Sequence, residues 1–552
     1  MQLESHDITG PMPLIDRAHT PSPTAAGAAL VAALLGRWSL TRGEIAAYCA
    51  QHFDLVSEGV DALLGAARLI YVEIDGEWLV RPAGTDHATW LSEVADREAS
   101  RAWFRRNVAL SGPFARASRV VDVARMMRGQ NPFGVDIFGW MLPQRPAALG
   151  SRTVVSIEGE AFSMPDLDAT RVVVEGERER ERENDDDSDT GGATLDLFSG
   201  NDYLGLRVHP KVRAAAMRVL RDTGVGSGGS RMLSGTSPEH RALERALARW
   251  KGTEDAVVFN SGWHANMAVT TAFAGPETVV FSDALNHASI IDGLRLSGAE
   301  VQVFAHNDAA DLARRIQLVR DDPARGPRAL SRGLIVVEGI YSMDGDVAPL
   351  GPIVDLAEAH GLTVHVDEAH SALVLGASGK GLCEHAGVAP GRVALQMGTL
   401  SKAFGGEGGY VAGRAGVIEA LKLLARPFWF STALPGASAA GSLAALEVAQ
   451  AEPERRARLW RNAAYLRGAL TDLGYDLCGS TSWIIPVLIG DEARTALLHH
   501  RLRDAGILAS AIFAPAVSRG QERVRLSLSS EHTRPQLERV VEVFEGFAEL
   551  RA

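Results

Sequence analysis

The sequence predicts an α/β protein with a large domain built on a mostly parallel sheet, a smaller C-terminal α+β domain and an extra N-terminal module. From residue 196 onward, short runs of β-branched residues alternate with helical patterns, which is typical of parallel strands joined by crossover helices. After residue 427 the pattern changes to one long helix, three strand-like runs and a closing helix. The composition, with 46% hydrophobic residues, 22% charged residues and 56 glycines, fits a globular α/β protein better than a disordered or fibrous one.

The predicted large domain covers residues 201–430, and the predicted small domain covers residues 431–552. Residues 398–409, between the last two strands of the large domain, are too few for a crossover helix, so we expect those two strands to pair antiparallel. The other strands of this domain are expected to be parallel. The predicted strands are Ala256–Phe259, Thr278–Phe281, Val301–Phe304, Leu334–Val337, Thr363–Val366, Val393–Met397 and Tyr410–Ala412 in the large domain, and Ser482–Val487, Ile507–Ile512 and Val524–Leu528 in the small domain.

Residues 1–95 are predicted to form a winged-helix-like module of three helices and a hairpin. The hairpin pairs Leu69–Ile74 with Glu77–Val80 across an Asp-Gly turn. A winged helix commonly binds DNA, but the third helix here, residues 57–67, carries two acidic residues and no basic one. Residues 1–90 contain 5 Arg, no Lys and 11 acidic residues, so a structural or docking role is favoured over DNA binding.

Residues 96–200 are expected to connect this module to the large domain. Within them, residues 175–192 are highly charged, poor in hydrophobic residues and end in two glycines. This composition predicts a solvated, mobile insertion.

Charge and cysteine content exclude several classes of function. The formal net charge of −12 opposes nucleic-acid binding, which needs excess Lys and Arg to neutralise phosphates. None of the three cysteines lies in a pair with metal-ligand spacing, so we expect no metal site and a reducing, cytoplasmic location. The N-terminus lacks the pattern of a signal peptide, and the longest early apolar run, residues 25–35, is too short to span a bilayer. We therefore expect no nucleic-acid partner and no membrane span.

Two carboxylates and a histidine directly follow the fifth predicted strand, at Asp367, Glu368 and His370. In open α/β sheets, ligands bind at the carboxyl ends of the strands. The same Asp-Glu-Ala-His run occurs in helicase motors, but those need an upstream Gly-x-x-x-x-Gly-Lys-Ser/Thr loop, which this sequence does not contain. A carboxylate that only caps the next helix is the other interpretation of this segment.

Lys402 lies just after the next predicted strand and is flanked by small residues. Burial at such a position lowers the pKa of an amine and makes it a better nucleophile toward an aldehyde. Thr399, three residues earlier, offers a hydroxyl group to a phosphate. Together with the carboxylate of Asp367, these residues supply the groups that pyridoxal phosphate needs for its aldehyde, its phosphate and its ring nitrogen.

Two further segments fit the same cofactor. The turn Ser261-Gly262-Trp263 joins a predicted strand to a predicted helix, so the amides of Gly262 and Trp263 can bind phosphate at the helix N-terminus. His287 follows another strand and can lay its flat ring on the pyridine ring. Taken alone, His287 would be interpreted as an ordinary strand-end histidine.

Seven motifs in collinear order resemble those of the α-oxoamine synthases, a family that includes 8-amino-7-oxononanoate synthase, aminolevulinate synthase, 2-amino-3-ketobutyrate ligase and serine palmitoyltransferase. The resemblance covers about residues 128–548 and leaves residues 1–110 and 175–192 without a counterpart. The motifs are Asn-Asp-Tyr-Leu-Gly-Leu from Asn201, Gly-Ser-Gly-Gly-Ser-Arg-Met from Gly226, Glu-Gly-Ile-Tyr-Ser-Met-Asp-Gly-Asp from Glu338, Asp-Glu-Ala-His from Asp367, Thr-Leu-Ser-Lys from Thr399, Arg-Pro-Phe-Trp-Phe-Ser-Thr from Arg426 and Arg-Val-Arg-Leu-Ser-Leu from Arg523.

This resemblance implies a pyridoxal-phosphate enzyme of fold type I that forms a homodimer with active sites at the subunit interface. Lys402 is then expected to form a Schiff base with the cofactor, while Asp367 pairs with its ring nitrogen. His370 is expected to bond the ring oxygen and His287 to stack on the ring. The other residues implied for cofactor binding are Ser261, Gly262, Trp263, Glu338, Ser342 and Thr399, with Ser431 or Thr432 reaching in from the neighbouring subunit.

For the substrate, the resemblance implies that Arg525 grips an amino-acid carboxylate in a bidentate fork and that Asn201 lines the substrate site. Arg523 lies two residues from Arg525 and so points to the same face of its strand, and only the register of the motif favours Arg525. Two structural ion pairs at the domain edge are the alternative for these arginines.

The implied reaction is a decarboxylative condensation of a small amino acid with an acyl thioester, on coenzyme A or a carrier protein, that gives an α-amino ketone. Two other functions stay open. One is a transcription regulator that fuses a winged helix to an aminotransferase-like domain, and the other is an aminotransferase or aldolase-type lyase on the same fold.

Overall fold

The chain divides into two units, residues 1–142 and residues 143–552. In the first unit, strands β1 (Leu69–Ile74) and β2 (Glu77–Pro82) pair antiparallel, which confirms the predicted hairpin. The predicted helices of the winged-helix module and the charged segment 175–192 lie outside the described residues. The structure, a computed structural model, describes residues 69–74, 77–82, 144–157, 160–174, 193–323, 330–514 and 516–548.

A seven-stranded sheet forms the centre of the second unit, in the order β6-β12-β11-β10-β9-β7-β8. Strand β12 is antiparallel to both of its neighbours, and the other pairings are parallel. The expected mostly parallel sheet and the expected antiparallel last pair are both confirmed. The strands are β6 (Asp255–Phe259), β7 (Val279–Asp283), β8 (Glu300–Phe304), β9 (Leu334–Glu338), β10 (Thr363–Asp367), β11 (Leu395–Thr399) and β12 (Gly409–Gly413).

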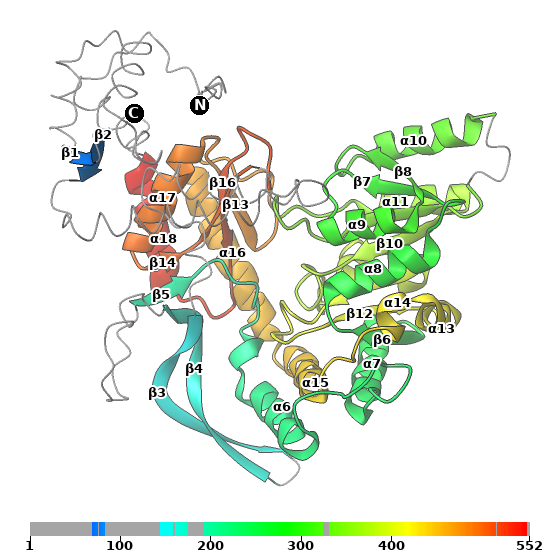
Figure 1. Cartoon of the computed structure of the whole chain (residues 1–552). Coiled ribbons are helices and arrows are strands. Elements are labelled where there is room, and N and C mark those ends of the chain that lie inside the picture. The colour runs from blue at the N-terminus through cyan, green and yellow to red at the C-terminus, as the bar shows by residue number, and fades with distance from the viewer. Residues whose placement is uncertain are drawn as a thin grey trace. The chain divides into compact units, whose positions relative to one another are not determined.

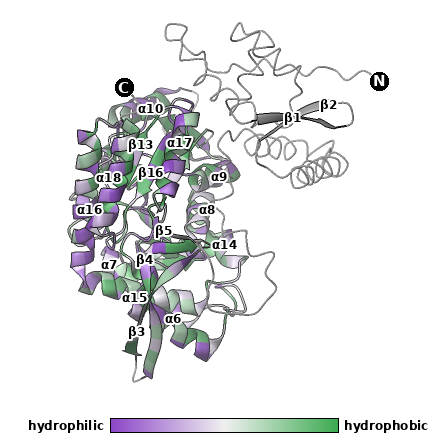
Figure 2. Ribbon diagram, turned by 90° about the vertical axis from the view of Figure 1, so that its left-hand side faces the viewer, coloured by the Kyte–Doolittle hydropathy of each residue, from purple (hydrophilic) through white to green (hydrophobic). Residues whose placement is uncertain are grey.

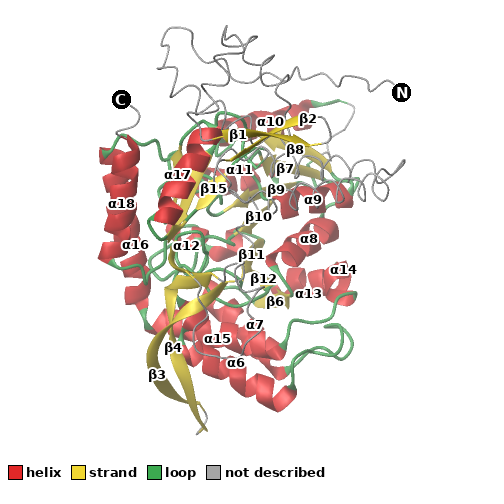
Figure 3. Ribbon diagram, turned by 60° about the vertical axis from the view of Figure 1, so that its left-hand side comes forward, coloured by secondary structure: helices red, strands yellow, loops and turns green. Residues whose placement is uncertain are grey.

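Helices cover both faces of this sheet, so successive strand residues enter different hydrophobic clusters. Val336 packs with α9 on one face, whereas Val337 packs into the main core on the other. Burial on both faces explains why these strands read as continuous hydrophobic runs. Figure 3 shows the strands following one another from β8 to β6, with α8, α9, α13 and α14 along one side. The helices are α7 (Pro238–Lys251), α8 (Gly262–Phe273), α9 (Ala288–Ser297), α10 (Ala309–Asp321), α11 (Leu350–His360), α12 (Leu382–His385), η5 (Pro390–Arg392), α13 (Ala415–Leu424) and α14 (Arg426–Trp429).

The C-terminal part contains a three-stranded antiparallel sheet of β13 (Ile484–Leu488), β16 (Arg523–Ser527) and β15 (Ser510–Ile512). The predicted strand Ile507–Ile512 is divided in two, because β14 (Ile507–Leu508) pairs with a different sheet. In Figure 2 helices α16 and α18 mix hydrophilic and hydrophobic residues, as expected for helices with one covered face. The helices of this part are α15 (Gly436–Ala451), α16 (Pro453–Asp472), α17 (Glu492–Asp504) and α18 (Arg534–Ala548).

A long hairpin of β3 (Gln144–Ile157) and β4 (Glu160–Val174) was not predicted from the sequence. It continues through β5 (Ala193–Leu197) into a four-stranded sheet of order β14-β5-β4-β3 (Figure 1). The backbones of Val174 and Ala193 are paired, so segment 175–192 joins two neighbouring strand ends. Strand β3 lies beside α6 (Pro210–Thr223), which follows the short η4 helix (Leu206–Val208). None of these observations tests the predicted domain boundaries, which stay predictions.

Candidate active site

Lys402 lies in the turn that follows β11, and its Nζ atom is 2.7 Å from Nε2 of His370. Burial lowers the pKa of this amine to about 8, although the carboxylates of Asp367 and Glu338 act in the opposite direction. A fraction of the amine is therefore unprotonated near neutral pH, which is the form that attacks an aldehyde.

His370 connects Lys402 to a buried tyrosine. Its Nδ1 atom lies 2.6 Å from the hydroxyl of Tyr203, which donates a hydrogen bond of 3.1 Å to Asn201 Oδ1. Burial and the positive charges of Lys402 and Arg525 hold the pKa of His370 well below its usual range, so the ring is neutral. Tyr203 is a residue that the sequence analysis missed, although it stands inside the motif that begins at Asn201.

Asp367 ends strand β10, and its carboxylate is fixed by two donors. Asn266 Nδ2 donates to Oδ2 at 2.7 Å, and the amide of Ala369 donates to Oδ1 at 2.8 Å. Asn266 is held in turn by Ser289 at 2.9 Å and contacts His365 at 3.3 Å. Asn266 and His365 are fully buried and were also missed, because no local motif marks a contact between residues about a hundred positions apart.

Glu368, the neighbour of Asp367, turns into the core and does not join the site. It forms a buried ion pair of 2.9 Å with Lys251 and accepts a hydrogen bond of 3.1 Å from the amide of Leu382. Gly381 is required here, because a Cβ atom at that position would lie 1.4 Å from Glu368 Oε2. The two carboxylates of the Asp-Glu-Ala-His run therefore have different roles.

The strand-to-helix turn before α8 meets the strand end that carries Thr399. Ser261 caps α8, since its hydroxyl accepts a hydrogen bond of 3.1 Å from the amide of His264. A Cβ atom on Gly262 would lie 3.2 Å from Thr399 Oγ1, so only glycine allows this approach without crowding. Ser431 lies beside the same turn, with Oγ 3.1 Å from Asn260 Nδ2. A helix N-terminus flanked by hydroxyl groups is a suitable site for a phosphate.

His287 occupies the N-cap of α9 and faces the same region. Its amide donates to Glu338 Oε1 at 2.5 Å, and its ring meets the Trp263 ring edge-on with centroids 6.1 Å apart. Burial lowers the pKa of His287, with Asp367 acting in the opposite direction. Burial also raises the pKa of Glu338 well above its usual range, and the adjacent Asp367 raises it further.

Ser342 and Thr432 are the two predicted cofactor residues with the least structural support. Ser342 is half-buried in the loop after β9. Thr432 forms an isolated backbone bridge with Ser230. Their roles stay predictions, as does the expectation that Ser431 or Thr432 reaches in from a second subunit.

Arg525 lies on β16 and points to the Asn201–Tyr203 side of the site. Its Nη2 atom donates to Asn201 Oδ1 at 2.9 Å and to Ser527 Oγ at 3.2 Å, and its buried Nε atom has no hydrogen-bond partner among the described residues. Arg523, by contrast, pairs with Asp344 at 2.7 Å. A desolvated guanidinium without a carboxylate partner is costly, so Arg525 is a better candidate than Arg523 for contact with an anionic ligand.

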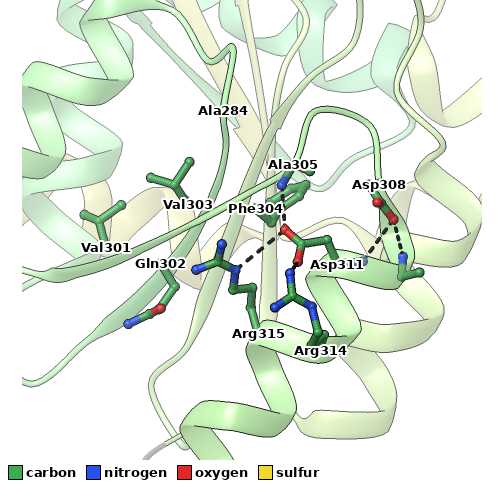
Figure 4. Close-up of a pocket in the computed structure, with 11 residues that line it drawn as sticks. Ala284, Val301, Gln302, Val303, Phe304, Ala305, Asp308, Asp311, Arg314 and Arg315 are labelled. Atoms are coloured by element: carbon green, nitrogen blue, oxygen red, sulfur yellow. Dashed lines mark hydrogen bonds and ion pairs between the residues drawn. The ribbon is translucent and has the colours of Figure 1, made fainter.

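The remaining candidates do not compete with this site. Among the described residues there is no group of three or more His, Cys, Asp or Glu side chains placed to hold a metal ion. A surface hollow of about 890 Å³ lies along the edge strand β8 and α10, where Asp311 accepts from the amide of Ala305 at 2.8 Å and pairs with Arg314 and Arg315 (Figure 4). None of the predicted site residues lines this hollow.

The site as a whole fits pyridoxal phosphate. A helix N-terminus and Thr399 suit the phosphate, the oriented carboxylate of Asp367 suits the ring nitrogen, and the desolvated amine of Lys402 suits the aldehyde. The three groups stand at the carboxyl ends of β6, β11 and β10 in one sheet, with β12 between β6 and β11, and ligands bind at this edge of open α/β sheets.

Comparison with known proteins agrees with this arrangement. Residues 195–544 match the family model described as aminotransferase class I and II. The 8-amino-7-oxononanoate synthase of Exiguobacterium sibiricum is 45% identical over 353 residues, which are 64% of this chain and 88% of that protein. The protein of the same name from Anaeromyxobacter dehalogenans (strain 2CP-1) is 46% identical over 348 residues, which are 63% of this chain and 85% of that protein.

Solved structures of serine palmitoyltransferases share the fold. The enzyme from Sphingomonas wittichii superposes with a TM-score of 0.65 at 30% identity, covering 80% of this chain and 99% of that one. A variant from S. paucimobilis with bound PLP-myriocin aldimine gives a TM-score of 0.63 at 32% identity, covering 72% of this chain and 92% of that one. The family match spans well over half of the sequence, and the motifs, the fold and the site agree with it. The chain belongs to the aminotransferase class I and II family and, within it, to the pyridoxal-phosphate-dependent α-oxoamine synthases.

Proposed function

We propose that this site joins the α-carbon of a small amino acid to the acyl group of a thioester, with Lys402 as the base and Arg525 as the carboxylate anchor. The observation that carries the proposal is the hydrogen-bonded series Lys402–His370–Tyr203–Asn201–Arg525, which places a desolvated amine and an unpaired guanidinium at the two ends of one site.

The cofactor is held by groups from several elements. Lys402 would bond to its aldehyde, Asp367 would face its ring nitrogen, and His287 would cover its ring. Bound pyridoxal phosphate supplies an electron-withdrawing ring that makes the proton on the amino-acid α-carbon removable. The phosphate ligands would be the amides of Gly262 and Trp263 and the side chains of Ser261, Ser342, Thr399, Ser431 and Thr432.

The chain's own residues then orient the substrate and move its proton. Arg525 and Asn201 hold the amino-acid carboxylate, which fixes the direction of the bond from the α-carbon to its hydrogen. Lys402, once its amine is free, accepts that proton, and neutral His370 keeps the amine in place. A carbon–carbon bond forms to the thioester carbonyl carbon, and the sulfur leaves as a thiolate. The substrate carboxylate then departs as carbon dioxide, and the proton held by Lys402 returns to the α-carbon.

The experiment is a product assay with the purified chain. Incubation with pairs of amino acids and acyl thioesters, on coenzyme A or a carrier protein, should release thiol and carbon dioxide in equal amounts and give an α-amino ketone by mass spectrometry. Lys402→Ala serves as the inactive control. Formation of a keto acid without thiol release would support an aminotransferase, and cleavage of a β-hydroxy amino acid would support an aldolase-type lyase.

A homodimer is the assembly that this proposal favours. Three exposed apolar side chains lie on the segments around the phosphate turn, Val225, Leu233 and Phe430, with exposed fractions of 81%, 83% and 74%. The backbone bridge between Ser230 and Thr432 brings the segments of Leu233 and Phe430 together. An apolar surface of this kind next to the site is suited to a second copy of the chain.

The proposal also covers the location of the enzyme in the cell and the role of residues 1–95. In the described part of the chain, no helix has both the length and the apolar character to cross a membrane. We propose a cytoplasmic enzyme whose residues 1–95 serve as a structural or docking module without affinity for nucleic acid, because their excess of acidic residues repels phosphates.

A further inference from the structure

His306 lies between two carboxylates at the carboxyl edge of the sheet, outside the groups assigned to the cofactor and the substrate. Its Nδ1 atom is 2.9 Å from Asp283 Oδ1, and its Nε2 atom is 2.7 Å from Asp346 Oδ2. A histidine that contacts a carboxylate through each nitrogen carries a proton on both. These two carboxylates outweigh the effect of burial and raise the pKa of His306 to about 10.

The three residues come from three consecutive strands. Asp283 ends β7, and His306 follows β8. Asp346 is the last residue of a loop after β9, residues 341–346, which is here called the 341–346 loop. Asn307 supports the same arrangement: its amide donates to Asp283 at 2.8 Å and its side chain donates to Asp346 at 2.6 Å. Asn307 adopts a φ of +53°, a left-handed conformation that asparagine tolerates better than most residues.

The other titratable groups around His306 are few. The Tyr341 ring meets the imidazole edge-on with centroids 4.4 Å apart. Glu338 lies farther away and acts electrostatically on Tyr341, as Asp283 does. Among these described neighbours no second cation lies against the two carboxylates, so His306 supplies the positive charge between Asp283 and Asp346, and Asn307 adds neutral hydrogen bonds to both.

The 341–346 loop also contacts the C-terminal part of the chain. Asp344 Oδ1 and the carbonyl oxygen of Met343 accept from Arg523 at 2.7 and 3.1 Å. The carbonyl oxygen of Gly345 accepts from the Ser480 hydroxyl at 3.3 Å. Gly345 has a φ of +69°, and a Cβ atom there would lie 2.2 Å from the carbonyl oxygen of Ile484, so the loop packs directly on β13.

We propose that the His306 imidazolium is a positioning residue for the amino-acid site. It fixes the 341–346 loop on the sheet, and the loop fixes Arg523, which is two residues from Arg525 on the same five-residue strand. This inference rests on the proposed role of Arg525. The contacts of His306 with Asp283 and Asp346 are here called the clamp. Lys402 and Asp367 end other strands, so the clamp acts on substrate affinity and leaves the groups at the cofactor's aldehyde and ring nitrogen in place. Ser342, a proposed phosphate ligand, lies in the same loop, so cofactor affinity is measured separately.

The test replaces His306 by a neutral side chain of similar reach. In His306→Gln, the amino-acid KM should rise roughly tenfold, as for loss of a charge-assisted contact. At saturating cofactor, kcat and the absorbance of the bound cofactor should change little. Backbone amide exchange should accelerate in the 341–346 loop and in residues 523–527, with or without cofactor. His209→Gln is the matched control, since His209 also faces a carboxylate, Glu452 at 3.5 Å, at a different place.

A second substitution in the same chain tests whether the charge of His306, and not only its shape, holds the 341–346 loop. Adding Asp346→Asn to His306→Gln removes the repulsion between the two carboxylates and should restore part of the amino-acid KM. In the unaltered protein, NMR of labelled histidine should show His306 with both ring protons at pH 8, and Asp346→Asn identifies its signal by shifting it. Loss of one ring proton below pH 8 would overturn the proposal.

The outcomes separate this inference from the proposed function. A KM that rises in Arg525→Lys and stays unchanged in His306→Gln, together with unchanged amide exchange, overturns the clamp. An unchanged KM in Arg525→Lys means that the assigned role of Arg525 is wrong. In that case the clamp is tested by amide exchange alone. Faster exchange of the 341–346 loop in His306→Gln supports the clamp, and unchanged exchange rejects it.

Discussion

Arg525 and Arg523 lie two residues apart on β16, and their partners differ. Arg523 is neutralised by Asp344, whereas Arg525 contacts only uncharged partners among the described residues. Arg525→Lys should therefore raise the amino-acid KM, because an ammonium cannot form two parallel hydrogen bonds. The expected loss of binding free energy is about 1.5–3 kcal/mol. Steady-state kinetics with Arg523→Lys as the control measure this. A larger effect in the control would mean that Arg523 binds the substrate.

Lys402 is the residue expected to carry the cofactor. Borohydride reduction followed by peptide mapping should place the pyridoxyl group on Lys402, and Lys402→Ala should abolish the covalent link because no other lysine lies at this strand end. Lys422→Ala, which removes a lysine paired with Asp255, should keep the label. Label on another lysine would contradict the assignment.

The lowered pKa of Lys402 gives a pH prediction. Its amine is protonated below about pH 8 and free above it, so covalent attachment of pyridoxal phosphate to the cofactor-free protein should accelerate as pH rises through about 8 and then level off. The Asp367 carboxylate raises this pKa, so Asp367→Asn should move the midpoint to lower pH. Stopped-flow absorbance follows the rate. A midpoint near the ordinary lysine value of 10.5 would show that burial is not effective.

The residues proposed to carry the chemistry could be named from the sequence, but the residues that hold them in place could not. Lys402, Asp367 and His370 stand in short motifs at strand ends, where position along the chain already suggests a role. Asn266 and His365 act through contacts with each other and with Asp367, and such contacts depend on the packing of α8 against the sheet. The motif register favoured Arg525 over Arg523, and the structure adds that Arg523 is paired with Asp344 whereas Arg525 contacts Asn201.

At the scale of elements, the strands of the seven-stranded sheet were predictable and the β3–β4 hairpin was not. The strands of the seven-stranded sheet fall within two residues of their predicted bounds, because continuous hydrophobic runs mark them. The β3–β4 hairpin contains prolines and many polar residues and has exposed apolar side chains such as Leu149 and Val154, so its pattern is weak. Strand Ile507–Ile512 was predicted as one because sequence does not reveal a change of partner sheet.

Ser261, the N-cap of α8, is expected to contribute both to folding stability and to cofactor binding. Ser261→Ala removes the hydrogen bond to the His264 amide and should lower the free energy of unfolding by about 1 kcal/mol. It should also weaken cofactor binding, because the same helix N-terminus is the proposed phosphate site. Asp308→Ala removes the cap of α10, where Asp308 accepts from Ala310 and Asp311 at 2.9 Å. That variant should lose similar stability and keep full cofactor affinity, as measured by denaturant unfolding and by cofactor titration.

At the scale of the whole molecule, the exposed apolar surface near the site gives a prediction about assembly. Phe430→Asp places a charge on a side chain that is 74% exposed in the single chain and should shift the protein from dimer to monomer. Leu318→Asp on α10, at a side chain that is 60% exposed, should leave the dimer intact. Light scattering after size-exclusion chromatography measures both. A monomeric unaltered protein with full activity would contradict the dimer.

The segments outside the family resemblance, residues 1–110 and 175–192, can be interpreted only from their composition, charge and pattern. The predicted boundaries at residues 95, 200 and 430 rest on composition and pattern alone, and they stay predictions. The hairpin of β1 and β2 agrees with a winged helix, but a hairpin of this kind occurs in many folds. Charge is the stronger guide to residues 1–95, and it favours a structural or docking role over nucleic-acid binding, which stays a prediction.

The pairing of Val174 with Ala193 has a consequence for how this protein changes over evolutionary time. The chain leaves the four-stranded sheet and returns to it at adjacent positions, so the distance that segment 175–192 must bridge is short whatever its length. Adding residues to such a connection costs little, since the entropy of closing a loop grows only slowly with its length. Insertions and deletions in this segment over evolution are therefore expected to cost little folding stability.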